Sequence, residues 1–183
     1  MQRDQLEHLV RAASAITQED TFVVIGSQAI LASFPDAPEL LLRSLEADVY
    51  PLHDPEKADL IDGDLGDGSM FHDQFGYYAH GVGPETAKAP AGWEERLVRV
   101  EVVTPYGPKD EALALCLEPH DLVLAKCARG DERDWEFADA ALAAGLVDLA
   151  VLVDRVDAMP LADVARDRVR SMLEAAPARI ERG

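Results

Sequence analysis

The sequence is poor in basic residues: among 183 residues, 17 Lys and Arg stand against 35 Asp and Glu, a formal net charge of −18. Affinity for nucleic acid rests largely on Lys and Arg side chains that neutralise phosphates. We therefore expect the chain to repel DNA and RNA unless a bridging metal, a basic partner or a local basic patch intervenes. Candidates for such a patch are Arg129, Arg133 and Arg155. A high negative charge also keeps a protein soluble.

Cysteine and long apolar runs are scarce as well. The two cysteines, Cys116 and Cys127, lie in apolar surroundings, which indicates reduced core residues and no disulfide or zinc framework. No run of about 18 apolar residues is present, so we expect no membrane-spanning segment. Residues 1–5 lack the apolar stretch of a secretion signal. These absences predict a cytoplasmic protein, and the 48% hydrophobic content is sufficient for a compact core.

The periodicity of the apolar residues predicts strands and helices first and helices alone later. A helix is expected over residues 2–17 and another over 55–67, and strands are expected at 21–26, 46–50, 96–103 and 112–117. Residues 67–83 are expected to mix a short helix, a strand and a functional loop. After Pro119, helices are expected at 119–129, 132–144, 147–156 and 161–180. This order favours a mixed β-sheet flanked by helices, with an α/β core at 1–110 and a helical lobe at 111–183 packed on it.

Three local features have the residue types of a site for phosphate and metal. Gly26-Ser27 stands where a strand becomes a helix, with Ser27 as the expected cap; such a junction can bind an anion, although an ordinary turn explains it too. Glu46 and Asp48, two apart on a strand, project to the same side. They repel each other unless a cation such as Mg²⁺ or Mn²⁺ neutralises them, or unless both are solvated on an exposed face. Glu101 interrupts a valine-rich strand and is either paired or on the solvent face.

Two histidines flank an aromatic segment. His72 and His80, with Asp73 between them, suggest zinc, but their spacing fits no standard ligand motif. Core packing is the default interpretation for these histidines. A pocket-lining role, with a base stacked on Tyr77 or Tyr78, is the alternative.

Taken together, these features make the sequence similar to the nucleotidyltransferase superfold. That pattern is an apolar strand ending in Gly-Ser, a helix, an acid–apolar–acid strand and a third acid on a later strand. Here it reads Val23-Val24-Ile25-Gly26-Ser27, then Glu46-Ala47-Asp48-Val49, then Val100-Glu101-Val102. Another register would place Asp48 first and Tyr50 second, which leaves one ligand fewer and would make the enzyme inactive. The chain also resembles a compact bacterial family of nucleotidyltransferase-like proteins over roughly residues 20–145. The most family-like stretch is 61–97, with Ile61-Asp62-Gly63, Phe71-His72, Phe75-Gly76-Tyr77-Tyr78 and Gly92-Trp93.

The C-terminal half adds a second resemblance, to the helical segment of AbiEii-type nucleotidyltransferase toxins. It rests on Leu117-Glu118-Pro119-His120-Asp121-Leu122, followed by Lys126, Arg133-Asp134 and Phe137. The resemblance implies that Gly26 and Ser27 hold a nucleoside triphosphate and that Glu46 and Asp48 bind Mg²⁺ or Mn²⁺. Glu101 would be a further ligand or the base. Lys126 would meet phosphate and Asp134 would position Lys126 or the acceptor, unless Lys126 is a surface lysine and Arg133-Asp134 a solvated pair.

Three functions follow as hypotheses. The first is metal-dependent transfer of a nucleoside monophosphate from a nucleoside triphosphate to a protein, a small molecule or a tRNA end, in a toxin-like role with a cognate protein partner or antitoxin. The second is a nucleotidyltransferase fold that has lost catalysis and serves as a binding or regulatory module. The third is a purely structural acidic interaction protein, which would have no cleft with converging carboxylates.

Overall fold

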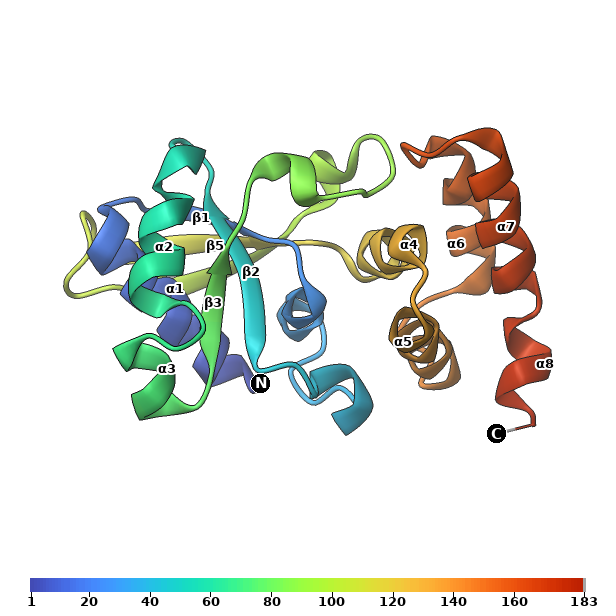
Figure 1. The fold of residues 1–183 in the computed structure, drawn as a ribbon, viewed down its shortest axis with the longest axis horizontal. Coiled ribbons are helices and arrows are strands. Elements are labelled where there is room, and N and C mark those ends of the chain that lie inside the picture. The colour runs from blue at the N-terminus through green and yellow to red at the C-terminus, as the bar shows by residue number, and fades with distance from the viewer. Residues whose placement is uncertain (183) are drawn as a thin grey trace. The chain divides into compact units, whose positions relative to one another are not determined.

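A computed structural model describes residues 1–182 and divides the chain into two compact units. The first unit comprises Met1–Thr86 and Leu97–Leu117. The second comprises Ala87–Arg96 and Glu118–Gly183. Gly183 lies outside the described residues. The expected division into a core at 1–110 and a lobe at 111–183 stays a prediction about domains. The mixed α/β fold with helices at the C-terminal end is confirmed (Figure 1).

The first unit is built on a five-stranded mixed sheet with the strand order β3-β2-β1-β5-β4. Strands β1 and β2 pair antiparallel, as do β4 and β5, whereas β1–β5 and β2–β3 are parallel pairs. The strands span Thr21–Val24 (β1), Glu46–Pro51 (β2), Tyr78–Gly81 (β3), Val98–Val103 (β4) and Glu111–Cys116 (β5). The strands expected at 21–26, 46–50, 96–103 and 112–117 are therefore present with small shifts of their ends.

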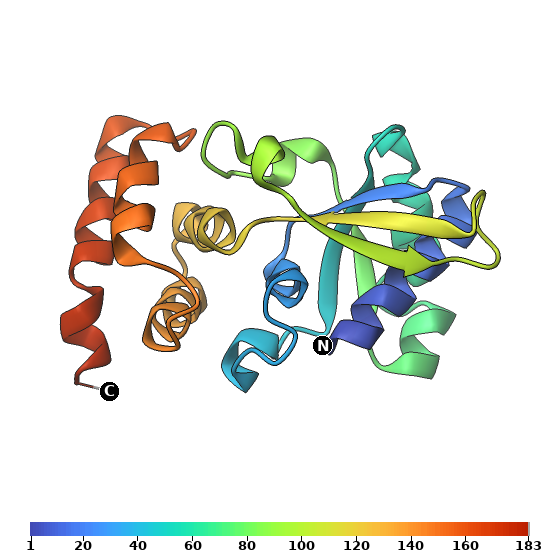
Figure 2. The same ribbon diagram turned by 180° about the vertical axis from the view of Figure 1, so that it is seen from behind.

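One face of the sheet is apolar and covered by helices. Its residues alternate along the strands and are all buried: Phe22, Val24, Ala47, Val49, Ala79, Val100, Val102, Ala112 and Ala114. Helix α1 (Arg3–Thr17) packs on β4 and β5, and α2 (Ala58–Leu65) packs on β2 and β3 (Figure 2). Gly81 faces α2, where a Cβ would lie 2.8 Å from the Ala58 carbonyl carbon. The polar residues of the strands therefore occupy the opposite face.

Short segments join the strands. Ser27–Ala32 forms a 3-10 helix and not the α-helix expected to begin after Ser27. Its N-cap residue is Gly26, without a side-chain cap, and the Ala29 amide donates to the Gly26 carbonyl at 2.9 Å, the i→i+3 spacing of a 3-10 turn. In the region 67–83 the structure has α3 (Met70–Phe75) followed by β3. The expected mixture of a short helix and a strand there is confirmed.

The second unit is helical. Its helices are α4 (Pro119–Arg129), α5 (Glu132–Ala143), α6 (Leu149–Arg155), α7 (Asp163–Glu174) and α8 (Ala176–Ile180). Glu118 caps α4 by accepting from the backbone amides of His120 and Asp121, and Gly130 ends that helix with φ 75°. The single helix expected over 161–180 is interrupted at Ala175, because Pro177 has no N–H to donate to the preceding turn.

The expectation for the two cysteines is confirmed. Cys116 and Cys127 are free and buried, and burial raises the pKa of each thiol to about 12, so both stay protonated at neutral pH. None of the helices in residues 1–182 combines the length and the apolar content that crossing a membrane requires.

Candidate metal centre

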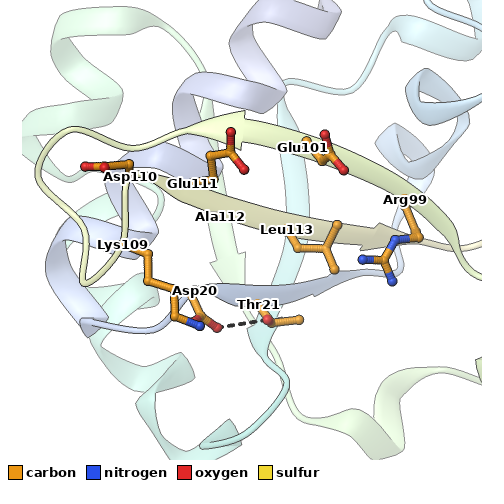
Figure 3. Close-up of a pocket in the computed structure, with 9 residues that line it drawn as sticks. All are labelled: Asp20, Thr21, Arg99, Glu101, Lys109, Asp110, Glu111, Ala112 and Leu113. Carbon is orange, nitrogen blue, oxygen red and sulfur yellow. Dashed lines mark hydrogen bonds and ion pairs between the residues drawn. The ribbon is translucent and has the colours of Figure 1, made fainter.

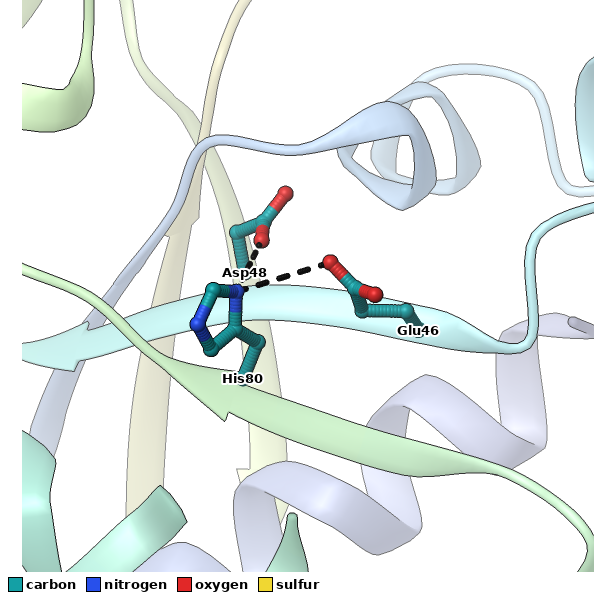
Figure 4. Close-up of side chains that lie close together, drawn as sticks. All are labelled: Glu46, Asp48 and His80. Atoms are coloured by element: carbon teal, nitrogen blue, oxygen red, sulfur yellow. Dashed lines mark hydrogen bonds and ion pairs between the residues drawn. The ribbon is translucent and has the colours of Figure 1, made fainter. Parts of the chain in front are cut away.

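The polar face of the sheet brings two acids and a histidine together at β2 and β3. The register pairs Glu46 with Tyr78 and Asp48 with His80 across the parallel strands. Residues two apart on a strand project to the same side, so all four side chains lie on one face. Figure 4 shows His80 turned toward both carboxylates from the neighbouring strand. The pairing of β2 with β3 thus brings Glu46 and Asp48 of one strand together with Tyr78 and His80 of the other in one cluster.

The geometry of this cluster suits a cation. His80 Nδ1 lies 3.3 Å from Asp48 Oδ1 and 3.6 Å from Glu46 Oε1. One ligand atom from each of Glu46, Asp48 and His80 can be chosen so that all lie within 4.8 Å of one another. Within residues 1–182 this is the single group of three or more His, Cys, Asp or Glu side chains with that property. The side chains are 35%, 26% and 51% exposed respectively, so the cluster is open to solvent on one side.

Burial and the neighbouring Glu46 make the ionised form of Asp48 unfavourable. Burial, a hydrogen bond with Glu46 and the charge of Glu46 together raise the pKa of Asp48 to about 6, and the nearby His80 opposes this only in part. Tyr78 Oη donates to Glu46 Oε2 at 2.8 Å, and this bond is the main reason that the pKa of Tyr78 rises to about 12. A pair of acids held at this cost fits a site that a divalent cation neutralises.

Gly26 has a steric role beside the pair. A Cβ at this position would overlap the Asp48 carboxylate, with Asp48 Cγ only 2.8 Å away. The Ile25 amide also donates to the Asp48 carbonyl at 3.1 Å, which extends the pairing of β1 and β2 to the cluster. Glycine at position 26 therefore lets the end of β1 lie directly against Asp48. Ser27, next in the chain, is half-buried at the start of the 3-10 helix.

Glu101 does not join the cluster. It lies on the same face of the sheet but on β4, where it is opposite Leu113, and Leu113 is opposite Thr21. Asp48 is instead level with Ile25, so the two acids are four residues apart along the strands and three strands apart across the sheet. Strand spacings make this separation roughly 20 Å. The expected convergence of Glu101 with Glu46 and Asp48 is therefore wrong.

Glu101 belongs to a different pocket (Figure 3). That pocket is lined by Asp20, Thr21, Arg99, Glu101, Lys109, Asp110, Glu111, Ala112 and Leu113. Lys109 forms an ion pair with Asp20 there, and Glu101 is exposed. Of the two interpretations from sequence, the solvent face is the correct one, because the valines at 100 and 102 take the buried side of β4.

Lys126 and Asp134 lie in the helical unit and contact each other. Lys126 Nζ is 3.3 Å from Asp134 Oδ1 and sits 4.7 Å from the centre of the Phe137 ring. Arg129 donates to both oxygens of Asp134, at 2.8 and 2.6 Å. Burial alone would raise the pKa of Asp134, but Arg129 and Lys126 outweigh it and lower that pKa. Asp134 is 1% exposed, so its interpretation as half of a solvated pair with its neighbour is wrong.

His80 is the member of the cluster that sequence reasoning missed. Sequence alone favours core packing for both histidines, yet the His80 side chain is 51% exposed. His72 instead contacts Asp67 at 3.0 Å and packs against the Tyr78 ring in a tilted arrangement, with ring centres 4.7 Å apart. The available signal was the spacing of Tyr78 and His80, which matches the two-residue period of Glu46 and Asp48.

Comparison with protein families supports the resemblance to nucleotidyltransferases. Residues 4–181 match the family model described as Nucleotidyltransferase of unknown function (DUF6036). The chain belongs to this family. As a family member it has a nucleotidyltransferase-type fold, in agreement with the mixed sheet and the flanking helices described above. No curated protein and no solved structure matches the chain.

Proposed function

We propose that this family member is a metal-dependent nucleotidyltransferase whose reaction centre is the cluster of Glu46 and Asp48. The observation that supports the proposal is the convergence of two carboxylates and a histidine on one face of the sheet, with one ligand atom of each within 4.8 Å of the others. The family match supports nucleotidyl transfer in general. The donor would be a nucleoside triphosphate, with Gly26 and Ser27 at the β1 end of the cluster as the residues assigned to its phosphates.

The residues present fit a divalent cation such as Mg²⁺ or Mn²⁺. Glu46 and Asp48 offer carboxylate oxygens to the same side of β2, and the pKa of Asp48 is raised by burial and by the nearby Glu46, both of which a bound cation would offset. When bound, the cation would neutralise charge on the phosphates and help to align them. Glu46 and Asp48 would hold it, and Tyr78 would keep Glu46 in place through its 2.8 Å hydrogen bond.

The reaction balances as a displacement at the α-phosphorus. A hydroxyl oxygen of the acceptor forms the new bond to the α-phosphorus, the bond from that phosphorus to the bridging oxygen breaks, and pyrophosphate leaves. The acceptor's proton is released to water. No step is assigned to Glu101, because of its distance from the pair, or to Lys126 and Asp134, which satisfy each other within the helical unit.

A transfer assay with matched variants tests this function. The full chain is incubated with α-labelled nucleoside triphosphates and Mn²⁺ or Mg²⁺, with protein, tRNA and small-molecule acceptors supplied in turn. Protein and tRNA acceptors are included because the hypothesis of a toxin-like role implies transfer to a macromolecule. Asp48→Asn and Glu46→Gln should each abolish label transfer, because each removes a carboxylate charge from the pair. Glu101→Gln is the control, since it removes the same charge from the same sheet face about 20 Å away. Transfer that persists in both cluster variants would refute the proposed site.

The position of Glu101 also favours a second candidate function. With Glu101 elsewhere, the cluster has two carboxylates where the nucleotidyltransferase pattern implies three. A nucleotide-binding or regulatory module without catalysis is consistent with that loss. Titration of a non-hydrolysable triphosphate distinguishes the two: binding that needs metal, together with label transfer, supports the enzyme. Binding that is independent of metal, without label transfer under any condition, supports the module.

A further inference from the structure

The histidine of the cluster has no counterpart in the pattern of acids from which the site was first inferred. It enters the site through strand pairing alone, because β3 runs parallel to β2 with His80 opposite Asp48. Its Nδ1 faces both acids, 3.3 Å from an oxygen of Asp48 and 3.6 Å from an oxygen of Glu46 (Figure 4). A single nitrogen that faces one oxygen of each acid occupies the position of a third ligand.

We propose that His80 Nδ1 is the third protein ligand of the cation held by Glu46 and Asp48, and that it makes the site prefer Mn²⁺ or another transition-metal ion over Mg²⁺. This inference rests on the proposed function and specifies its metal. Mg²⁺ strongly prefers oxygen ligands, whereas imidazole nitrogen is a good ligand for first-row transition metals. A set of two oxygens and one nitrogen therefore discriminates against Mg²⁺.

The surroundings of the cluster keep His80 available for a metal. Its side chain is half exposed, so its ring can move by a fraction of an ångström toward an ion without disturbing the core. Tyr78 holds Glu46 by Oε2, which leaves Oε1, the oxygen nearer His80, turned into the cluster. On the other side Gly26 allows Asp48 to lie close to β1. Glu46 is thus oriented by a neighbouring side chain, as is usual around protein metal sites, and the absence of a side chain at Gly26 leaves room for Asp48.

An ordinary ion pair between His80 and Asp48 is the competing explanation. It would require a protonated imidazole and would give no nitrogen ligand to a bound metal. Pulsed electron paramagnetic resonance of Mn²⁺ separates the two explanations, because a directly bound imidazole gives a ¹⁴N modulation that is independent of catalytic activity.

The test uses the full chain with Mn²⁺ alone and with Mg²⁺ alone. We expect the wild-type protein to bind one Mn²⁺ with ¹⁴N modulation and to bind Mg²⁺ more weakly. His80→Asp, which replaces nitrogen by oxygen, should abolish the modulation and reduce the preference for Mn²⁺ over Mg²⁺. His80→Gln should lose the modulation and weaken Mn²⁺ binding. His72→Gln is the matched control, a neighbouring histidine outside the cluster, and should keep both properties.

The outcomes separate this inference from the proposed function. Mn²⁺ that binds at Glu46 and Asp48 without ¹⁴N modulation, or modulation that survives His80→Asp, would overturn the role of His80 and leave the carboxylate site standing. An unchanged Mn²⁺ to Mg²⁺ ratio in His80→Asp would overturn the claimed selectivity. Absence of metal binding together with absence of label transfer in the wild-type protein would instead remove the proposed function and this inference with it. Circular dichroism and thermal unfolding confirm that each variant is folded.

Discussion

The carboxylate pair should make the metal-free protein less stable than it would be without one of the charges. Replacing Asp48 by Asn keeps the shape of the side chain and removes its charge from beside Glu46. In the wild-type protein without metal, the pKa of Asp48 is raised from 3.8 to about 6, because burial and Glu46 disfavour its ionised form. Asp48→Asn should therefore stabilise the protein at neutral pH even though it removes the proposed activity.

The sign and size of this effect follow from the pKa. The folded protein binds a proton at Asp48 more tightly than the unfolded chain, so the free energy of unfolding falls as the pH rises from about 4 to about 6. Below that range Asp48 is protonated in both the folded and the unfolded protein, so the neutral Asn side chain should have nearly the same effect on stability as the neutral acid. A pKa raised from 3.8 to about 6 lowers the free energy of unfolding at pH 8 by about 3 kcal/mol relative to a protein without this charge. Because the side chain is 26% exposed, solvent screening reduces the expected stabilisation by Asp48→Asn to about 2 kcal/mol. This corresponds to a Tm about 4–8 °C above that of the wild-type protein.

The measurement is thermal unfolding of wild type and Asp48→Asn in a chelator, at several pH values from 4.5 to 8. The difference in Tm should be largest at pH 8 and should shrink toward pH 4.5. Adding Mn²⁺ at pH 8 should then raise the Tm of the wild-type protein and leave the variant nearly unchanged, because binding to the folded state stabilises it. A variant that is less stable than wild type at pH 8, or a difference that does not vary with pH, would refute the proposed repulsion.

Two further substitutions test other parts of the structure. Gly26→Ala places a methyl group against Asp48, so we expect Mn²⁺ affinity measured by calorimetry to fall and the free energy of unfolding to drop by about 1–3 kcal/mol. Asp121→Ala removes a carboxylate that is 0% exposed and accepts hydrogen bonds from Arg96 at 2.7 Å and Arg155 at 2.9 Å. The loss of these ion pairs should lower the free energy of unfolding by about 3 kcal/mol and the Tm by about 6–12 °C in thermal unfolding.

Each of these substitutions has a matched control. A Cβ at Gly63, in α2, would meet nothing within 4 Å, so Gly63→Ala should leave Mn²⁺ affinity unchanged and stabilise the helix by up to about 1 kcal/mol. Asp163 pairs with Arg166 but is 87% exposed, so Asp163→Ala should cost less than about 1 kcal/mol. Equal losses of Mn²⁺ affinity in both glycine variants would contradict the contact with Asp48, and equal losses of Tm in both aspartate variants would contradict the buried network.

The stability of the site and its proposed function are opposed in this molecule. Glu46 and Asp48 are held close together by the pairing of β2 with β1 and β3, at a cost that shows in the raised pKa of Asp48. Such pairs of titratable groups with shifted pKa values cluster at functional sites. The same residues placed apart would be more stable and would have less reason to bind a cation.

The sequence by itself determined most elements of the sheet and one pair of candidate metal-binding residues. Alternating and apolar runs located the strands because a strand with one buried face imposes a two-residue period on its sequence. The same period put Glu46 and Asp48 on one side of β2, a local property that needs no tertiary information. The helices of the C-terminal half followed from their apolar spacing, except at Pro177, where the break was missed.

Only the tertiary structure decided which other residues meet the pair. His80 reaches it because β3 pairs with β2 in a register that no spacing along the chain reveals, more than 30 residues after Asp48. Glu101 shares the sheet face and fails to reach the pair, because β1 and β5 lie between β2 and β4. Periodicity fixes the face of a strand on which a side chain lies, whereas the order and the register of the strands fix its neighbours.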